Sequence, residues 1–326
     1  MNFEEIERYA VDKISTQKNH LFNYHFKWIS ETYHGHPFSN GIVHNCHLVE
    51  QRIDGYAKRF IDILASINTK TVEHYDQLLQ YIAELIVVGH LAETLGIEWV
   101  FEDEPTATGS KKNPEVSVSN GELTILVEVK SPRFHEYQEK RTKSGLQIPT
   151  RIDNGFKDVV EGVFNTKASL PRDNIVKDFL ISANDKFKYF KIADENVLSV
   201  LVIVWDDYIY EPISSLKNDF SGLITENSYY KDNDGNPFIF ENIDNVILLR
   251  HMTQVKHSTI DISVTDGLKH PLDYGKRGVT LPKALLTVNE HSKEEVLFDI
   301  FECERQEDLE VFAEYKPQET IMWFGF

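Results

Sequence analysis

The stretch from residue 115 to residue 130, EVSVSNGELTILVEVK, constrains the fold more than any other part of the sequence. Two runs of alternating apolar and polar residues flank Asn120-Gly121, the dipeptide most typical of a two-residue β-turn. We expect an antiparallel hairpin in which Ser119 pairs with Glu122. The fold must therefore contain a sheet, and this hairpin sets which side chains share a face.

The rest of the chain mixes helical patterns with strand patterns. Apolar residues at helical spacing predict long helices, and short β-branched runs predict buried strands. The expected helices cover 71–96, 155–167 and 172–191, and the expected strands cover 97–101, 196–205 and 245–250. This mixture predicts an α/β fold with a mixed β-sheet core flanked by helices.

A chain of 326 residues is long enough for one enlarged domain or two unequal ones. We expect an N-terminal helical appendage over 1–70, a core over 71–255 and a C-terminal β-rich extension over 256–326. Two cysteines give no disulfide framework, and no apolar run is long enough for a membrane span. These features favour a cytoplasmic protein that does not enter membranes.

Charge is distributed unevenly. The whole chain carries a net charge of −18, whereas the window 111–151 is net +3. Nucleic-acid binders neutralise phosphates with basic side chains, so this window is the candidate contact surface, although a solvated loop explains the charges equally well. The candidate nucleic-acid contacts are Lys111, Lys112, Arg133, Lys140, Arg141 and Lys143.

The hairpin places charged side chains in an apolar strand. With the expected register, Glu115 lies opposite Leu126 and shares a face with Glu128 and Lys130, because side chains alternate along a strand. The diagonal between the two glutamate backbones is then about 7–8 Å. Glu128 and Lys130 are about 6.6 Å apart along the strand, so we expect them to need a third partner rather than each other.

That partner is expected to be a divalent cation. Mg²⁺ or Mn²⁺ takes oxygen ligands, which Glu115, Glu128 and the Val129 carbonyl could supply. Such an ion would polarise a phosphate and lower the pKa of a bound water, while the Lys130 ammonium orients that water or stabilises developing charge. Glu84 adds a fourth candidate, since it falls on the apolar stripe of the helix expected over 71–96.

These residues together resemble the PD-(D/E)XK nuclease superfamily. The resemblance rests on the helix with Glu84, a strand, Pro114-Glu115, and Glu128-Val129-Lys130 after twelve intervening residues. It implies a restriction-endonuclease-like fold, with Glu115 and Glu128 as metal ligands, Lys130 as the catalytic lysine and Glu84 assisting. The first acid of the family is usually Asp, where this chain has Glu115. The downstream Gln and Tyr of one branch have only Lys186 and Tyr189 as weak counterparts here.

The expected function is a Mg²⁺-dependent nuclease acting on nucleic acid, with DNA favoured over RNA. The alternatives are a catalytically inactive relative that binds nucleic acid or a protein partner, and a protein whose charged strand carries a structural ion pair. A zinc site among the histidines before residue 48 is a weaker alternative, because their spacing matches no common zinc motif. Cleavage mode, sequence specificity and oligomeric state, a homodimer included, stay open.

Overall fold

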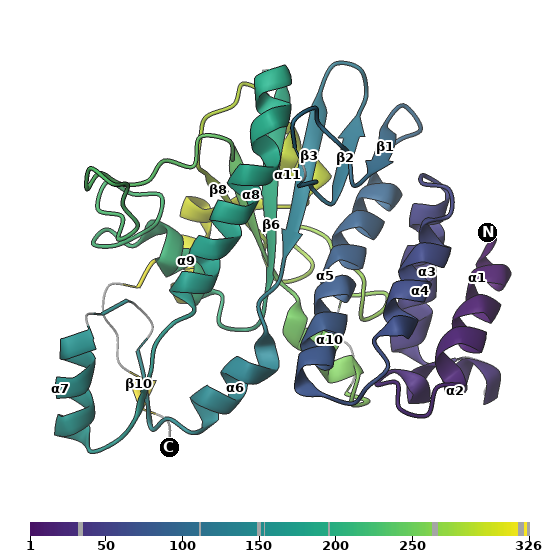
Figure 1. Ribbon diagram of the computed structural model, residues 1–326, viewed down its shortest axis with the longest axis horizontal. Helices are drawn as coiled ribbons and strands as arrows, with labels where there is room; N and C mark the ends of the chain where they lie inside the picture. Colours follow the sequence, from purple (N-terminus) through teal and green to yellow (C-terminus); the bar gives the residue numbers. More distant parts are fainter. Residues whose placement is uncertain are drawn as a thin grey trace.

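The computed structural model describes most of the chain (Figure 1). The described residues are 1–31, 35–110, 112–148, 151–152, 154–194, 196–262, 267–318 and 323–324, of which 29–31, 154 and 323–324 are described by backbone alone. Within these residues, no helix combines the length and apolar character needed to cross a bilayer.

A seven-stranded mixed sheet forms the centre of the molecule, in the order β1-β2-β3-β6-β7-β8-β9. Strands β3, β6 and β7 run parallel to one another, and the β1-β2, β2-β3 and β7-β8 pairs are antiparallel. The expected α/β class is therefore confirmed. The strands are β1 (Val100–Asp103), β2 (Val116–Ser119), β3 (Thr124–Lys130), β6 (Val197–Trp205), β7 (Asn245–Arg250), β8 (Ala284–Thr287) and β9 (Glu304–Arg305).

Strand β6 is the most deeply buried element, and all nine of its residues are buried. Its run of Val, Leu and Ile suits a strand covered on both faces. The one polar residue inside it, Ser199, is satisfied because its hydroxyl donates to the Asn242 carbonyl at 2.7 Å. The predicted strands over 196–205 and 245–250 are confirmed as β6 and β7.

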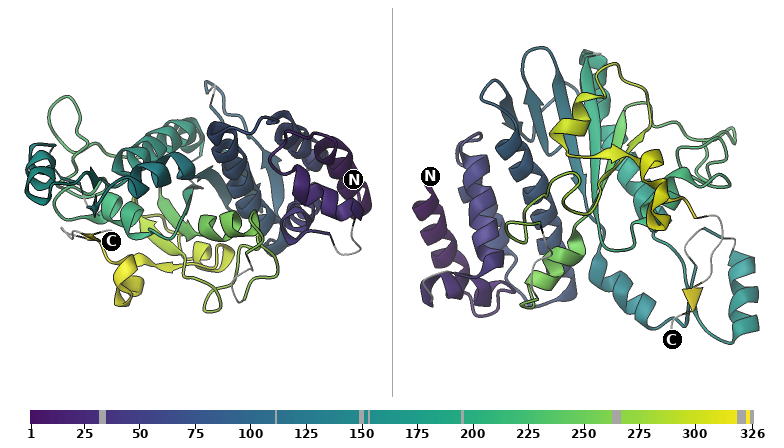
Figure 2. Two further views of the ribbon diagram at one scale, coloured as in Figure 1. Left: turned by 90° about the horizontal axis from the view of Figure 1, so that it is seen from below. Right: turned by 180° about the vertical axis from the view of Figure 1, so that it is seen from behind.

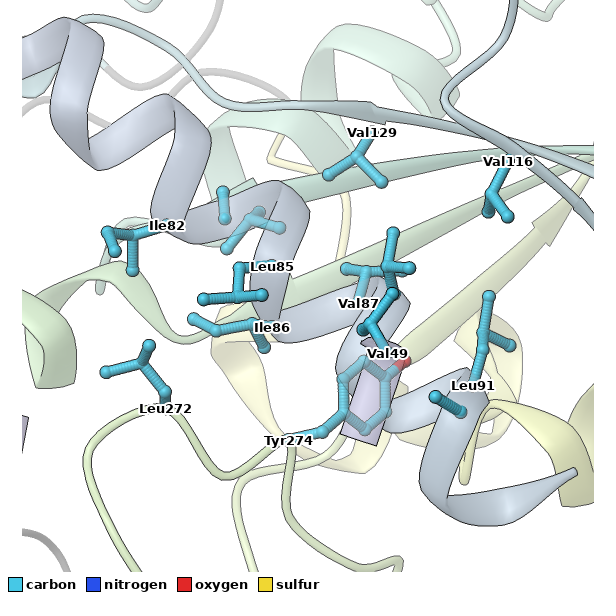
Figure 3. Packing of buried hydrophobic residues seen from close by; sticks show 14 of the residues in the cluster. Val49, Ile82, Leu85, Ile86, Val87, Leu91, Val116, Val129, Leu272 and Tyr274 are labelled. Carbon is cyan, nitrogen blue, oxygen red and sulfur yellow. The ribbon is translucent and has the colours of Figure 1, made fainter. Parts of the chain in front are cut away.

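Helix α5 (Val72–Thr94) covers one face of the sheet. Figure 3 shows Leu85, Ile86 and Val87 of this helix packed with Val129 of β3 in a cluster that reaches Tyr274. The N-terminal helices stack outward from α5, and α3 contacts it directly (Figures 1 and 2). Those helices are α1 (Phe3–Ala10), the π-helical turn Val11–Ser15, α2 (Asn23–Glu31), α3 (Pro37–Glu50) and α4 (Tyr56–Ser66).

Helices α8 (Asp173–Ala193) and α9 (Tyr210–Lys217) cover the opposite face. Leu126 of β3 packs there with Leu180 and Phe187 of α8. The two faces of the sheet thus carry two separate apolar clusters, and alternate residues of β3 enter one or the other.

A three-stranded sheet with the order β10-β4-β5 lies beside α6 and α7, apart from the central sheet (Figures 1 and 2). Its elements are β4 (Leu146–Gln147), β5 (Ala168–Ser169) and β10 (Trp323–Phe324), with α6 (Phe134–Thr142) and α7 (Asn154–Phe164) alongside.

The segment expected as a C-terminal extension shares the central sheet, because β8 and β9 pair within it. It also contains short helical elements. These are the last three residues of α10 (Met252–Ser258), α11 (Val296–Ile300) and the 3₁₀ turns Gln306–Val311 and Ala313–Tyr315.

Candidate functional site

The β2-β3 hairpin exists, but its loop is longer than expected. Ser119 pairs with Thr124 rather than with Glu122, so the expected two-residue turn is wrong. The Asn120 side chain explains the difference, because its Oδ1 accepts hydrogen bonds from the backbone N–H groups of Glu122 and Leu123, both at 3.0 Å. Gly121 has φ 88°, a value that favours glycine. The four residues 120–123 therefore form the loop.

This change moves the register by two residues, which preserves the faces, because side chains repeat with period two. Glu115, one residue before β2, donates its N–H to the Val127 carbonyl at 3.0 Å. It therefore lies beside the Val127–Glu128 peptide instead of opposite Leu126. The two glutamates are neighbours across the hairpin, closer than the diagonal expected from the sequence.

Glu128 is the most deeply buried member of the cluster, with 0% of its side chain exposed. Its Oε1 lies 2.5 Å from the Lys130 Nζ, so the expectation that these two residues could not satisfy each other is wrong. The four-carbon stem of lysine is flexible enough to fold back along the strand.

Lys186 of α8 is the member that the sequence identified only weakly. Its Nζ lies 2.7 Å from Oε1 and 2.8 Å from Oε2 of Glu128, and 3.5 Å from Oε1 of Glu115. The usable signal was its place in the helix, three residues after the buried Ala183 and next to the buried Phe187. Tyr189, its proposed companion, is exposed and lies near Gly109.

The electrostatics of the cluster are governed by burial. Burial raises the pKa of Glu115, and the Glu128 carboxylate raises it further, against the opposing effect of Lys186. For Lys186, burial alone would lower the pKa, but the charges and hydrogen bonds of Glu128 and Glu115 together outweigh burial, and the pKa lies above its ordinary value. Glu115 therefore holds its proton to a higher pH than an exposed glutamate does, and the raised pKa of Lys186 favours its charged form.

Glu84 belongs to the same electrostatic group. It is half-buried on α5, and burial holds its pKa well above the ordinary value. The next cause is the charge of Glu115, with Lys130 acting in the opposite direction. The structure thus brings all four predicted charged residues, Glu84, Glu115, Glu128 and Lys130, into one electrostatically linked region.

The carboxylate oxygens of this cluster could hold a hard cation only if the side chains around them rearranged. Oε1 of Glu128 is buried and, among the described residues, takes part in no hydrogen bond of ordinary geometry, although two ammonium groups lie at ion-pair distance. Across the described ranges, no three His, Cys, Asp or Glu side chains are gathered closely enough to hold a metal. The Lys186 ammonium lies between Glu115 and Glu128, where it supplies the positive charge that an ion would supply.

The predicted nucleic-acid contacts are dispersed. Lys112 pairs with Asp185 at 2.7 Å, and Lys140 pairs with Glu136 at 2.8 Å. Lys143 lies 3.6 Å from Glu139, Arg133 is exposed just before α6, and Lys111 lies outside the described residues. Three of these cations thus have acidic neighbours.

Arg141 is only 9% exposed, whereas the other four candidates that the structure describes, Lys112, Arg133, Lys140 and Lys143, are exposed. Its guanidinium lies over the Tyr208 ring, 3.2 Å from the centroid, and it donates from Nη2 to Gln147. The Val129 side chain packs in the apolar cluster beneath α5 and does not join the charged cluster.

The N-terminal histidines that suggested zinc have structural partners in the described part of the chain. Nε2 of His20 lies 2.8 Å from the Leu64 carbonyl, and Nε2 of His36 lies 2.8 Å from Oδ1 of Asp261. His34 lies outside the described residues. These contacts support helix packing in this region.

Comparisons of the chain with protein-family models, with curated proteins and with solved structures found no match. The geometry of the cluster is therefore the guide to the function of this chain.

Proposed function

We propose that this chain is a metal-dependent nuclease that hydrolyses phosphodiester bonds, with DNA as the expected substrate. The observation that carries the proposal is that Glu115, Glu128 and Lys130 lie together at the hairpin. The charge of Glu115 also acts on Glu84 of α5. Buried acids with raised pKa values beside a lysine are typical of catalytic sites.

The arrangement of elements supports a restriction-endonuclease-like core. Helix α5 precedes the three antiparallel strands β1, β2 and β3, and α8 then leads into β6, which pairs in parallel with β3. The acids lie on β3 and beside β2, and the assisting acid lies on the preceding helix. This is the order that the resemblance implies for Glu84, Glu115, Glu128 and Lys130.

In this proposal Glu115 and Glu128 hold Mg²⁺ or Mn²⁺, with Glu84 and the Val129 carbonyl completing the oxygen donors. When bound, the ion supplies a Lewis acid and a water of lowered pKa. Lys130 orients that water or stabilises the charge that develops on the phosphate. Lys186, whose ammonium lies between the two acids, would have to give way to a bound ion.

The testing experiment incubates circular, linear and single-stranded DNA, and RNA, with Mg²⁺ or Mn²⁺ and follows cleavage on gels. Cleavage should occur with the wild-type chain and be lost with Glu128→Ala and with Lys130→Ala. Glu122→Ala removes an exposed acid of the same hairpin loop and Lys188→Ala an exposed lysine of α8, so both should cleave normally. Wild-type cleavage that survives in EDTA would contradict the proposal.

One observation favours a second candidate, a nuclease-like module that binds nucleic acid without cutting it. Lys130 and Lys186 already compensate the charge of Glu128, so the cluster is stable without an ion. Such a module should bind DNA equally well in EDTA and in Mg²⁺, with no cleavage of any substrate.

A further inference from the structure

A large cavity lies apart from the carboxylate cluster. It has a volume of about 860 Å³, and none of Glu84, Glu115, Glu128 and Lys130 lines it. Its walls include His135, which follows β3, Asp206, which follows β6, and Thr253, which follows β7. The cavity therefore lies at the carboxyl ends of three parallel strands, where open α/β sheets commonly bind ligands.

The charges that line this cavity are unbalanced. Asp206 is paired with Arg172 at 2.8 Å, and Asp207 with Arg250 at 3.2 Å. The cavity lysines are not balanced in this way, since no carboxylate of the described residues lies within ion-pair distance of Lys70 or Lys256. The Lys256 Nζ donates only to the neutral Gln138 amide, at 2.8 Å. In a chain of net charge −18, this local excess of cations favours an anionic ligand.

Buried polar atoms of the same wall lack hydrogen bonds. Arg141 is 9% exposed, and its Nε and Nη1 donate to no acceptor in the described structure, although Nη1 lies 3.8 Å from Glu211. Nδ1 of His135 and Nδ1 of His25 are also buried without a hydrogen-bond partner. Unsatisfied buried polar groups are costly, so a ligand with several acceptor oxygens would be favoured here.

The ligand must also be larger than a simple anion, because the cavity has many times the volume of a phosphate. Aromatic rings from Phe22, Tyr75 and Tyr208 line it beside the cations. Aromatic walls next to basic side chains match a planar base joined to a phosphate. We propose that this cavity binds a nucleoside phosphate, either free or as one unit of a nucleic-acid strand.

The strand form of this proposal rests on the proposed function, whereas the free-nucleotide form does not. Isothermal titration calorimetry in EDTA, where no cleavage occurs, compares thymidine monophosphate, a short oligothymidylate, inorganic phosphate and thymidine. The variants are Lys256→Gln and Lys70→Gln in the cavity, with Lys58→Gln on α4 as the remote control. The Lys70 side chain is exposed, so its variant keeps the test valid if Lys256→Gln fails to fold.

We expect thymidine monophosphate or the oligothymidylate to bind more tightly than phosphate or thymidine. The cavity variants should raise that Kd about tenfold, whereas Lys58→Gln should leave it unchanged. Binding of the oligothymidylate alone identifies the strand as the source of the ligand. The inference would be overturned if neither thymidine monophosphate nor the oligothymidylate bound more tightly than phosphate. It would also be overturned if the cavity variants folded and bound these ligands as tightly as the wild type does. If the wild type binds the nucleotide but cleaves no substrate in the Mg²⁺ or Mn²⁺ assay, only the proposed function is overturned.

Discussion

Lys186→Met is the most informative single change, because it removes the positive charge between the two acids and keeps an unbranched side chain only one atom shorter. In the wild type the Lys186 side chain is 16% exposed and lies 2.7 Å from Glu128 and 3.5 Å from Glu115. In the variant these acids keep only Lys130 as a counter-charge. The variant should therefore be less stable and should bind divalent ions more readily.

The size of the effect follows from the burial of the pair. Removing one partner of a buried ion pair costs about 3–5 kcal/mol, and we take about 3 kcal/mol because Lys130 remains at 2.5 Å. An unfolding entropy of about 2.1 cal/mol/K per residue gives about 0.7 kcal/mol/K for 326 residues. The melting temperature should fall by about 4 °C. An ion at about 100 times its Kd contributes about 2.7 kcal/mol and should restore most of that loss.

The assay is thermal denaturation of the wild type, Lys186→Met and Lys188→Met, each in EDTA and across a Mg²⁺ and Mn²⁺ titration. Lys188 is exposed on the same helix, so its variant should behave like the wild type. The metal-induced rise in melting temperature should be larger in Lys186→Met than in either control. Equal metal responses in all three proteins would refute the idea that Lys186 occupies an ion site.

Three further predictions can be checked by denaturation. Burial raises the pKa of Glu84 above its ordinary value of 4.5. The protonated Glu84 side chain therefore makes its full contribution to stability below about pH 4.5, and this contribution is lost as the pH rises through the raised pKa. Glu84→Gln should therefore raise the melting temperature at pH 8 and not at pH 4, and the exposed Glu93→Gln should have no effect at either pH. Arg172→Gln leaves two buried acids without their cation and should lower the free energy of unfolding by about 3–5 kcal/mol, measured as a lower urea midpoint. The exposed Arg277→Gln should change the urea midpoint little. Gly121→Ala meets no nearby atom but strains a φ of 88°, so it should cost about 1–2 kcal/mol and keep cleavage; complete loss of cleavage would contradict the assigned loop.

The sequence predicted the central strands well, because their patterns are local. An uninterrupted β-branched run identified β6, and Asn120-Gly121 identified the hairpin. The strand expected at 97–101 begins later, at Val100, and Ile97 is 95% exposed. Strand order was not accessible, since the pairing of β8 with β7 depends on long-range packing that leaves no short sequence pattern.

The site was predictable in composition but not in geometry. Side-chain alternation was enough to place Glu128 and Lys130 on one face, and the stripe on α5 marked Glu84. Two details depended on side-chain chemistry that periodicity does not show. The Asn120 side chain bonds two loop amides and moves the register, and Lys186 comes from a helix 58 positions away to reach Glu128.

The contact between Lys186 and Glu128 also has a consequence for folding kinetics. A hairpin closes within microseconds, but the lysine can reach Glu128 only after α8 docks and β6 pairs with β3. Until then the Glu128 carboxylate stays hydrated. Formation of the Lys186–Glu128 ion pair should therefore lag behind the hairpin signal and report a long-range step of assembly.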